Sequence, residues 1–478
     1  MTHPYSFVIL LITMKKRILN KYFGDKAFYA MVLAVAVPII IQNGISNFVN
    51  LLDNIMVGKI GTEQMSGVAI VNQLMFVFNL ALFGVTSGPG IFTAQYFGQK
   101  NNEGVKHTFR FKLLASVLVS LAGIGLMILK QDMLISLFLT DTTGKLDIAA
   151  TLAYAKDYLY VMLWGLVPFA ITCSYTGTLR EAGETKLPMI SGLVAVGVNL
   201  VLNALLIFGL LGLPKLGVVG AAVATVISRF VELLIVIIWT HTHKEKAPYA
   251  VGLYKGFYMP AALCKKIIIT GTPLFLNEFM WSMGMSAVTQ CYSTRGLEVI
   301  AAFNISNTIV NLFNVALISM GNVVAIIVGQ ILGSENRDEA VDVDRKLIVL
   351  SVLSTALLAI ILIITAPLFP LFFNTTQEIR DLSVVIMRIA ALFMPVGAYL
   401  NSAYFTIRSG GKTFITFLFD SAYLWVICFP IAFVLSRFTS IEIIPMYALI
   451  LSLDFIKVGI GAFLLKKRIW VQNLVDEK

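Results

Sequence analysis

Residues 72–82, NQLMFVFNLAL, occur a second time in related form as residues 307–317, NTIVNLFNVAL, 235 positions further along the chain. Without any gap, the same offset aligns identical residues over a longer region: Pro38 with Pro273, Gly61 with Gly296, Glu63 with Glu298, Asn72 with Asn307, Phe78 with Phe313, Gln95 with Gln330 and Asn101 with Asn336. Chance matches between apolar runs do not reproduce polar residues and glycines in this way. The chain therefore contains an internal repeat.

Both copies lie in runs that are apolar enough to cross a membrane. Of the 478 residues, 58% are hydrophobic and 13% are charged, and the mean hydropathy is +0.86, whereas soluble domains carry about 25% charged residues. The apolar runs are continuous rather than alternating with polar residues, which favours helices over transmembrane strands. We predict an all-α integral membrane protein with twelve transmembrane helices in two pseudo-symmetric six-helix lobes.

Twelve runs reach the length of roughly 17 to 25 residues that a helix needs to cross the hydrocarbon core. They lie near residues 27–56, 66–97, 111–130, 154–179, 186–210, 217–240, 264–292, 300–332, 346–373, 382–407, 411–436 and 441–465. The predicted domains are a cytoplasmic N-terminal segment (1–26), an N-lobe (27–240), a cytoplasmic linker (241–263), a C-lobe (264–465) and a cytoplasmic tail (466–478).

The distribution of basic residues predicts the orientation. With the N-terminus inside, twenty-five of the thirty-six Lys and Arg residues fall on the cytoplasmic side and nine on the other side, as the positive-inside rule requires. Both termini are then cytoplasmic. Because each half has an even number of spans, the halves are parallel repeats, and a cleft between them is the expected pathway. The short apolar stretch at 7–13 does not resemble a signal peptide, and Met14 is a candidate for the true start.

Several function classes are disfavoured by the sequence. The net charge of +10 comes from basic residues scattered through short loops, rather than from one basic domain with stacking aromatics that would bind nucleic acid. The four cysteines form no CxxC motif, and no histidine has metal-ligand spacing. An intramembrane enzyme would need a catalytic dyad or metal cluster at membrane depth, and we identify neither. We expect no enzymatic activity and no cofactor.

The combination of motifs resembles the multidrug and toxic compound extrusion (MATE) family, in its bacterial NorM-like branch, over essentially the whole chain. The residues that carry the resemblance are Pro38, Gln42, Asp53 and 56–58 in the first span, 95–98, Arg180, Gly183, Thr185, Asn199, Asn203, 220–225 and 328–333. The resemblance implies a monomer in the bacterial cytoplasmic membrane that works by alternating access. It also implies export of drugs and other small, often cationic, organic compounds, driven by Na⁺ or H⁺.

Asp53 is the leading candidate for cation coupling, because a carboxylate within a span is costly unless it contacts water, a partner or an ion. Asn199 and Asn203 are four residues apart and share one helix face, and Thr225 adds a hydroxyl. From the residues alone, a surface-loop position for Asp53 and simple interhelical hydrogen bonding by the asparagines stay open. The resemblance places Asp53 at the acid of the family's N-lobe cation site, which the asparagines and Thr225 would complete with neutral oxygens.

A second coupling group in the C-lobe is less well defined. Glu278 lies in the middle of the seventh span, one turn from Trp281, where the family often has its acid. Some relatives place another acid in the tenth span, where this chain has Gly397 and Ala398. Asp420 in the eleventh span is a candidate substitute, and a structural pairing is an equally open interpretation. The i,i+3 spacings of Arg229 with Glu232 and of Asp454 with Lys457 predict structural ion pairs within one helix.

The remaining candidates concern substrate and motion. Gln42, Trp281 and Tyr399 are candidates for lining a substrate cavity, the aromatics through attraction of their ring faces for cations. Four prolines inside spans, Pro38, Pro168, Pro273 and Pro395, are candidate hinges because each removes a helix hydrogen bond. The alternative function is a flippase for lipid-linked saccharides, which would favour several cationic residues along the cleft. When the basic residues towards the ends of the runs are counted with the two sides, only Arg229 and Lys457 remain within spans, each near an acid.

Overall fold

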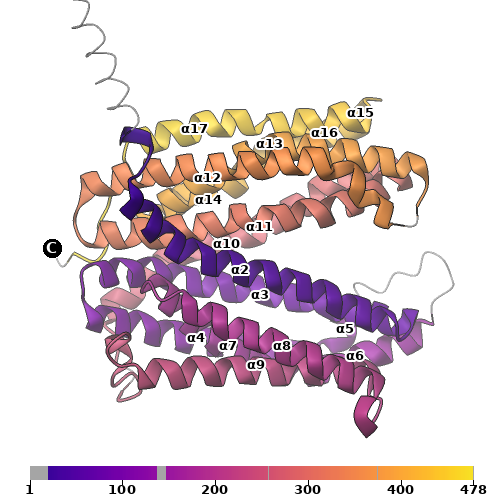
Figure 1. Ribbon diagram of the computed structural model, residues 1–478, viewed down its shortest axis with the longest axis horizontal. Helices are drawn as coiled ribbons and strands as arrows, with labels where there is room; N and C mark the ends of the chain where they lie inside the picture. The colour runs from indigo at the N-terminus through magenta and orange to yellow at the C-terminus, as the bar shows by residue number, and fades with distance from the viewer. Residues whose placement is uncertain (1–19, 137–146, 257, 374, 477–478) are drawn as a thin grey trace, which may run out of the picture. The chain divides into compact units, whose positions relative to one another are not determined.

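The computed structural model describes residues 20–136, 147–256, 258–373 and 375–476, apart from the side chains of 50, 51, 54 and 55. The candidate start Met14 lies outside these ranges. Within them the regular secondary structure is entirely helical, as the composition predicts. Figure 1 shows the helices and their order along the chain.

The chain divides into two compact units, which we call the N-unit (residues 41–275) and the C-unit (residues 1–40 and 276–478). Two long helices contribute to both: α2 (Lys26–Gly58) and α10 (Ala261–Ser293). The N-unit further contains α3 (Thr62–Gly98), α4 (Asn102–Leu129), α5 (Gln131–Ser136), α6 (Ile148–Trp164), α7 (Leu166–Glu181), α8 (Lys186–Phe208), η1 (Leu210–Gly212), α9 (Gly217–Thr242) and η2 (Pro248–Ala250).

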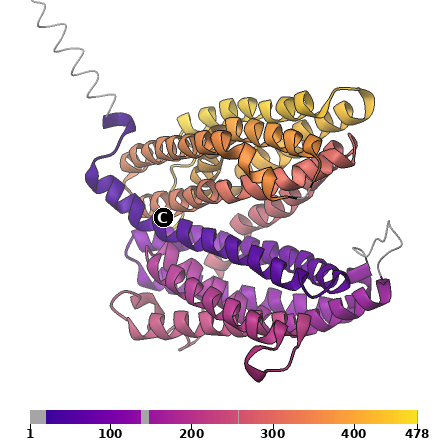
Figure 2. The ribbon, with the colours of Figure 1, turned by 45° about the vertical axis from the view of Figure 1, so that its right-hand side comes forward.

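The C-unit repeats much of this arrangement with more interruptions. It contains α11 (Leu297–Gly333), α12 (Arg337–Thr365), η3 (Ala366–Phe372), α13 (Gln377–Ser409), α14 (Thr413–Phe417), η4 (Leu418–Ala422), η5 (Leu424–Cys428), α15 (Phe429–Phe438), α16 (Ile443–Ser452) and α17 (Asp454–Lys466). Helix α13 packs against α11, α12 and α17. The orange and yellow helices of this unit stay side by side when the view is turned (Figures 1 and 2).

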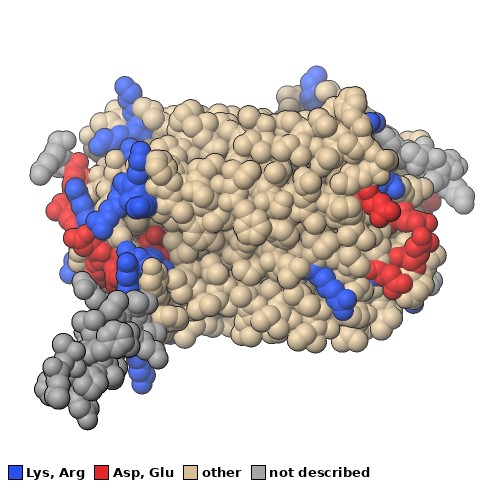
Figure 3. Space-filling model, turned by 90° about the horizontal axis from the view of Figure 1, so that it is seen from above, with Lys and Arg blue, Asp and Glu red and all other residues tan. Residues whose placement is uncertain are grey.

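The helices correspond to the twelve predicted spans. In the described ranges ten helices are long and apolar enough to cross a membrane, and the bent pair α6 and α7 makes an eleventh span if it is counted as one. The twelfth, α10, has 33 residues but is more polar, since it carries Asn277 and Glu278. Figure 3 shows one face of the molecule, where charged side chains gather towards the two ends and other residues form the zone between them.

The internal repeat is reproduced in the helix boundaries. Helices α2 and α10 both have 33 residues, and α3 and α11 both have 37, each pair at the offset of 235. The turn after each 37-residue helix contains a non-glycine residue with positive φ, Lys100 (59°) in the first half and Glu335 (63°) in the second. Because side chains rarely adopt this conformation, its recurrence at one repeat position indicates the same chain reversal in both halves.

Helix α4 shows how the N-unit is adapted to a bilayer. Its Leu118, Leu121 and Leu126 are each more than half exposed, as large apolar side chains can be where lipid is the solvent. Its buried face carries small hydroxyl residues instead, and Ser116 Oγ lies 2.9 Å from Ser174 Oγ of α7. Small polar residues allow membrane helices to approach closely and to bond across the interface.

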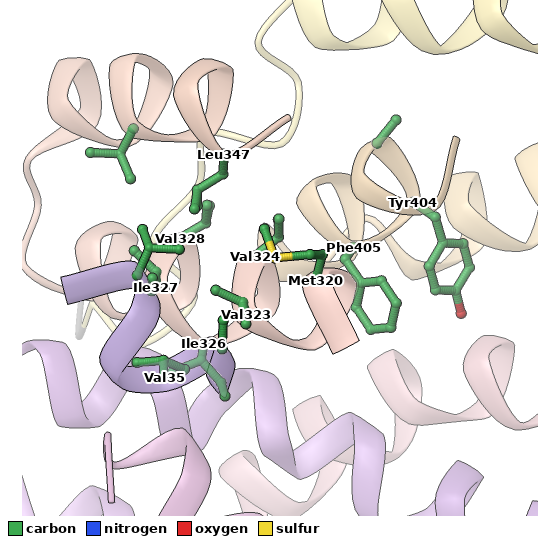
Figure 4. Packing of buried hydrophobic residues seen from close by; sticks show 14 of the residues in the cluster. Val35, Met320, Val323, Val324, Ile326, Ile327, Val328, Leu347, Tyr404 and Phe405 are labelled. Atoms are coloured by element: carbon green, nitrogen blue, oxygen red, sulfur yellow. The ribbon is translucent and has the colours of Figure 1, made fainter. Parts of the chain in front are cut away.

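The core of the C-unit is formed mainly by α11, together with the first turns of α2 and parts of α12 and α13. Figure 4 shows Val323, Val324 and Met320 of α11 within this cluster, with Val35 of α2 beside Ile326. The clustering of β-branched and other apolar side chains fixes how these helices are rotated about their axes, and therefore which side chains each one turns inward.

The fourth predicted span, 154–179, is bent beside Pro168, one of the four prolines expected to remove a helix hydrogen bond. It consists of α6 and α7, which meet at Gly165 with a bend of 47°. The cause is Pro168, which lacks an N–H group to donate to the carbonyl of Trp164, four residues earlier. The helix therefore breaks at the turn that precedes the proline.

Candidate cation sites

The four residues predicted for the N-lobe site come together in the N-unit, from three helices. Asp53 lies near the end of α2, Asn199 and Asn203 lie on α8, and Thr225 lies on α9. Asn203 Nδ2 donates to Asp53 Oδ1 at 2.7 Å, although the two residues are 150 positions apart. Both asparagines are buried, Asn203 to 1% exposure. The carboxyl group of Asp53 thus contacts the amides of Asn199 and Asn203, and Asn199 connects it to the hydroxyl of Thr225.

The amide of Asn199 connects the acid to Thr225. Its nitrogen lies 3.1 Å from both carboxylate oxygens of Asp53 and donates to them, and its oxygen accepts from Thr225 Oγ1 at 3.2 Å. The carboxylate of Asp53 therefore accepts hydrogen bonds from the amides of both asparagines.

One more oxygen is available at this cluster. Asn203 Oδ1 is buried and has no hydrogen-bond partner among the described residues. Buried amide oxygens are normally bonded, and leaving one unbonded costs about 1–3 kcal/mol. The donor set of one carboxylate, two amide oxygens and one hydroxyl is the kind that binds a hard cation.

A second polar cluster lies in the C-unit and contains both acids predicted for it. Tyr404 of α13 donates to Glu278 Oε1 at 3.3 Å, and Figure 4 shows the Tyr404 hydroxyl pointing away from the apolar cluster. Asn277 Nδ2 lies 3.2 Å from Asp420 Oδ2 and 3.3 Å from the Tyr404 hydroxyl. Lys457 donates to Asp420 Oδ1 at 2.7 Å. Glu278 and Asp420 are therefore linked through Asn277 and Tyr404.

Asp420 lies in a helix segment that departs from α-helical geometry. Segments η4 and η5 are π-helical and interrupt the region between α14 and α15. Single π-helical turns within α-helices are frequent at functional sites. Here the local widening coincides with the turn that directs Asp420 towards α10 and α17.

Both predicted intrahelical ion pairs are wrong. Lys457 pairs with Asp420 of the neighbouring segment rather than with Asp454. In the described structure Arg229 also makes no salt bridge to Glu232, and its guanidinium stacks on the ring of Phe169 at 4.7 Å. An i,i+3 spacing makes an ion pair within one helix possible. In both cases a group on another helix made the contact instead, so helix packing determined the partner.

The arrangement can be compared with known proteins. The sequence model of the MatE family matches residues 38–205 and 273–438, one segment in each half of the repeat. The chain belongs to the MatE family. It is 27% identical over 410 residues to the probable multidrug resistance protein NorM of Thermotoga maritima, covering 85% of each chain. It is 26% identical over 423 residues to the probable multidrug resistance protein YoeA of Bacillus subtilis, covering 86% of this chain and 88% of that protein.

Solved structures agree on the fold. A multidrug resistance MATE family transporter of the MOP superfamily, in an outward-facing conformation, superimposes with a TM-score of 0.81 at 20% identity, over 94% of this chain and 97% of the other. A MOP superfamily transporter from Pyrococcus furiosus gives a TM-score of 0.81 at 19% identity over the same shares, and the reversed polarity of its binding pocket suggests a different function.

The predicted cavity and hinge residues of this MatE chain have varied surroundings. Gln42 Oε1 accepts from Arg180 at 2.5 Å, Trp281 is exposed, and Tyr399 lines a pocket within the C-unit. Pro38 lies in α2, Pro273 in α10 and Pro395 in α13. The boundaries between the two units fall two residues after Pro38 and Pro273, so both helices that cross from one unit to the other do so beside a repeat-related proline.

Two buried ionisable residues were not recognised from the sequence. Lys112 was counted among the basic residues of the cytoplasmic side, but it lies in α4, is 0% exposed and pairs with Glu181. Asp344 was not considered; it lies in α12, is 4% exposed and accepts from Thr406 Oγ1 at 2.5 Å. Both are close to runs of charged residues, which makes them look like parts of loops. A signal was present nonetheless, since an apolar run that continues the same helix follows Lys112 directly and follows Asp344 after Arg345 and Lys346.

Proposed function

We propose that this MatE chain is an antiporter that exports drugs and other small organic compounds, often cationic, in exchange for inward-moving Na⁺ or H⁺. The observation that carries the proposal is the N-unit cluster, in which the carboxylate of Asp53 accepts from Asn203 at 2.7 Å and the buried amide oxygen of Asn203 has no hydrogen-bond partner among the described residues. Support for drugs as the substrate class comes from the two bacterial relatives named as probable multidrug resistance proteins. The cation is a transported substrate, and the chain is assigned no cofactor.

The Asp53 cluster supplies a physical basis for coupling. Without a bound cation, the amides of Asn199 and Asn203 donate to the carboxylate of Asp53, which links α8 to the charge on α2. A proton or Na⁺ at the carboxylate competes with these donors and so changes the contacts between the two helices. A cation shifts a conformational equilibrium only through such a difference in its interactions with the two states.

The experiment that tests the proposal is transport by the purified protein in sealed vesicles. A Na⁺ gradient and a pH gradient are imposed separately, and the movement of a fluorescent organic cation is followed. We expect the dye to move against its own concentration gradient when one of these two cation gradients is imposed. Vesicles without protein are the control. Transport of a lipid-linked saccharide without dye movement would favour the flippase. Dye movement that occurs only downhill, with either gradient, would contradict antiport.

The second cluster is assigned a supporting role, with Glu278 as its responsive acid. Asp420 has the ammonium group of Lys457 as its partner at 2.7 Å, whereas Glu278 accepts from the Tyr404 hydroxyl and is also under the electrostatic influence of Arg408. Glu278 is the acid in this cluster that we assign to respond to transport, because intramembrane acids usually serve function.

Replacing Glu278 with Gln is expected to reduce dye export several-fold while leaving folding intact. Glutamine keeps the acceptor for Tyr404 but removes the ionisable charge, and intramembrane acids usually serve function rather than stability. Initial rates of dye export would be measured together with the thermal unfolding midpoint. Glu298→Gln, an exposed position in the first turn of α11, is the control. Wild-type export by a fully expressed Glu278→Gln protein would leave Glu278 with a packing role only.

We also propose that the protein lies in the bacterial cytoplasmic membrane as a monomer, with both termini and the segment 241–263 on the cytoplasmic side. In a cysteine-free background, a cysteine at the exposed Lys246 should resist an impermeant thiol reagent added to intact cells, and one at the exposed Lys59 should react. Permeabilised cells control for accessibility. Labelling of the Lys246 position from outside would reverse the orientation, which rests on the excess of basic residues on one side.

A further inference from the structure

The C-unit contains a pocket with no role in the proposed coupling. It has a volume of about 820 Å³ and lies between α12, α13 and α17, with Lys21 and Tyr22 ahead of α2 and Trp470 after α17 completing its wall. Ligand pockets usually have volumes of roughly 300 to 1,000 Å³, so the space is adequate for an organic ligand.

The pocket has a basic end and an apolar end. Lys21, Arg345, Lys466 and Arg468 line one end, and the ion pair of Arg468 with Asp338, at 3.2 Å, places that end at the first turn of α12. Along α12 the wall then continues with Ile348, Val349, Val352 and Leu353. Eight residues separate Arg345 from Leu353, which corresponds to about 12 Å at 1.5 Å per residue.

Two of the four cations are available to a ligand. Arg345 and Arg468 have Asp342 and Asp338 as partners, whereas Lys21 and Lys466 have no acidic partner within 4.0 Å in the described part of the chain. A further donor is the indole N–H of Trp470, which is 1% exposed and has no hydrogen-bond partner there. Two ammonium groups and an unbonded N–H are suited to an anion with several acceptor oxygens.

The one acid in the wall limits where an anion can lie. Asp344 is buried and receives a hydrogen bond from Thr406, so the interior of the pocket presents an acidic group rather than a basic partner for an anion. The anionic group must therefore lie at the mouth, next to Lys21 and Lys466. The apolar end is left for a hydrocarbon chain, and it reaches the helix surface at Leu353, which is 51% exposed.

We propose that this pocket binds an anionic phospholipid, with the phosphate between Lys21, Lys466 and Trp470 and one acyl chain along α12 from Ile348 to Leu353. An organic cation fits less well, because the two basic residues without an acidic partner, Lys21 and Lys466, outnumber the one acid of the wall, Asp344. Free phosphate would leave the apolar end empty. Basic pockets between membrane helices are suited to anionic headgroups. The proposal requires only that the chain lies in a membrane, and it does not depend on the drug, the coupling ion or the transport direction.

The test uses the full chain, purified in detergent, with binding measured by native mass spectrometry. Short-chain phosphatidylglycerol is expected to bind in preference to short-chain phosphatidylcholine. The double variant Lys21→Ala, Lys466→Ala should weaken phosphatidylglycerol binding about tenfold or more. The matched control is Lys26→Ala, Lys467→Ala, which removes the same charge at nearby exposed positions that do not line the pocket. Equal loss in both double variants would reduce the effect to general surface charge and overturn the proposal.

Three further arms separate the possible ligands. Asp344→Asn should strengthen phosphatidylglycerol binding, and a clear weakening would contradict an anion at the mouth. Val352→Trp, confirmed as folded by its unfolding midpoint, should weaken lipid binding by filling the apolar end. Unchanged lipid affinity would show that no acyl chain lies in this part of the pocket. Complete displacement of the lipid by millimolar inorganic phosphate would identify the pocket as a site for free phosphate and overturn the assignment to lipid.

Discussion

An Asp53→Asn protein is expected to lose uphill export while it still binds dye. Asparagine keeps the size of the side chain and a hydrogen-bond acceptor for Asn203, but it has no charge to attract a cation and no proton to exchange. The coupling between two ligands of a transporter is typically about 5- to 150-fold in affinity, and we expect it to fall to nearly one. The measurement pairs dye export by vesicles under an imposed gradient with equilibrium dye binding, with and without the cation.

The controls for this prediction come from the same unit. Asp157→Asn removes an exposed acid from α6 and should leave export unchanged. Asn199→Ala and Asn203→Ala each remove one neutral ligand, worth about 0.5–1.5 kcal/mol as a hydrogen bond, and should weaken coupling less than Asp53→Asn. Uphill export at the wild-type rate by Asp53→Asn would exclude the N-unit cluster as the coupling site. Glu278 with Asp420 would then be the leading candidate.

Lys112→Met should destabilise the folded protein by about 3 kcal/mol or more, the range for breaking a buried ion pair on one side. Lys112 is fully buried and donates to Glu181, whose carboxylate would lose its ammonium partner in the variant. Methionine replaces the aliphatic part of the lysine side chain, so the loss of stability comes mainly from the loss of the charge. The measurement is the thermal unfolding midpoint of purified protein in detergent.

A matched pair on the same helix provides the control. Lys106 pairs with the exposed Glu103 at 2.6 Å, and exposed pairs contribute about 0–1 kcal/mol. Lys106→Met should therefore shift the midpoint little. The double variant Lys112→Met, Glu181→Gln should recover part of the stability, because the buried charge is removed together with its partner. Equal shifts of the unfolding midpoint for Lys106→Met and Lys112→Met would show that the buried pair stabilises the protein no more than the exposed pair.

The N-unit site was accessible from the sequence because its signals are local. Asn199 and Asn203 share a helix face by their spacing alone, and the motif resemblance singled out Asp53. The orientation of the Asn199 amide and the unbonded oxygen of Asn203 were not accessible, because they depend on the distances across three helices. In the C-unit, Glu278 and Asp420 were identified, but the partner of Lys457 was assigned to its own helix. Sequence spacing does not reveal which neighbouring helix lies closer.

The sequence by itself determined the twelve spans, the internal repeat and the all-helical class. In a bilayer the backbone must satisfy its hydrogen bonds within each segment, so a run of apolar residues is sufficient to specify a helix. The tertiary structure alone decided which polar side chains meet: Asn203 with Asp53, Lys457 with Asp420, Lys112 with Glu181. Those pairings depend on how each helix is rotated and on which helix packs beside it, and this is set by the packing of small and β-branched side chains from distant parts of the chain.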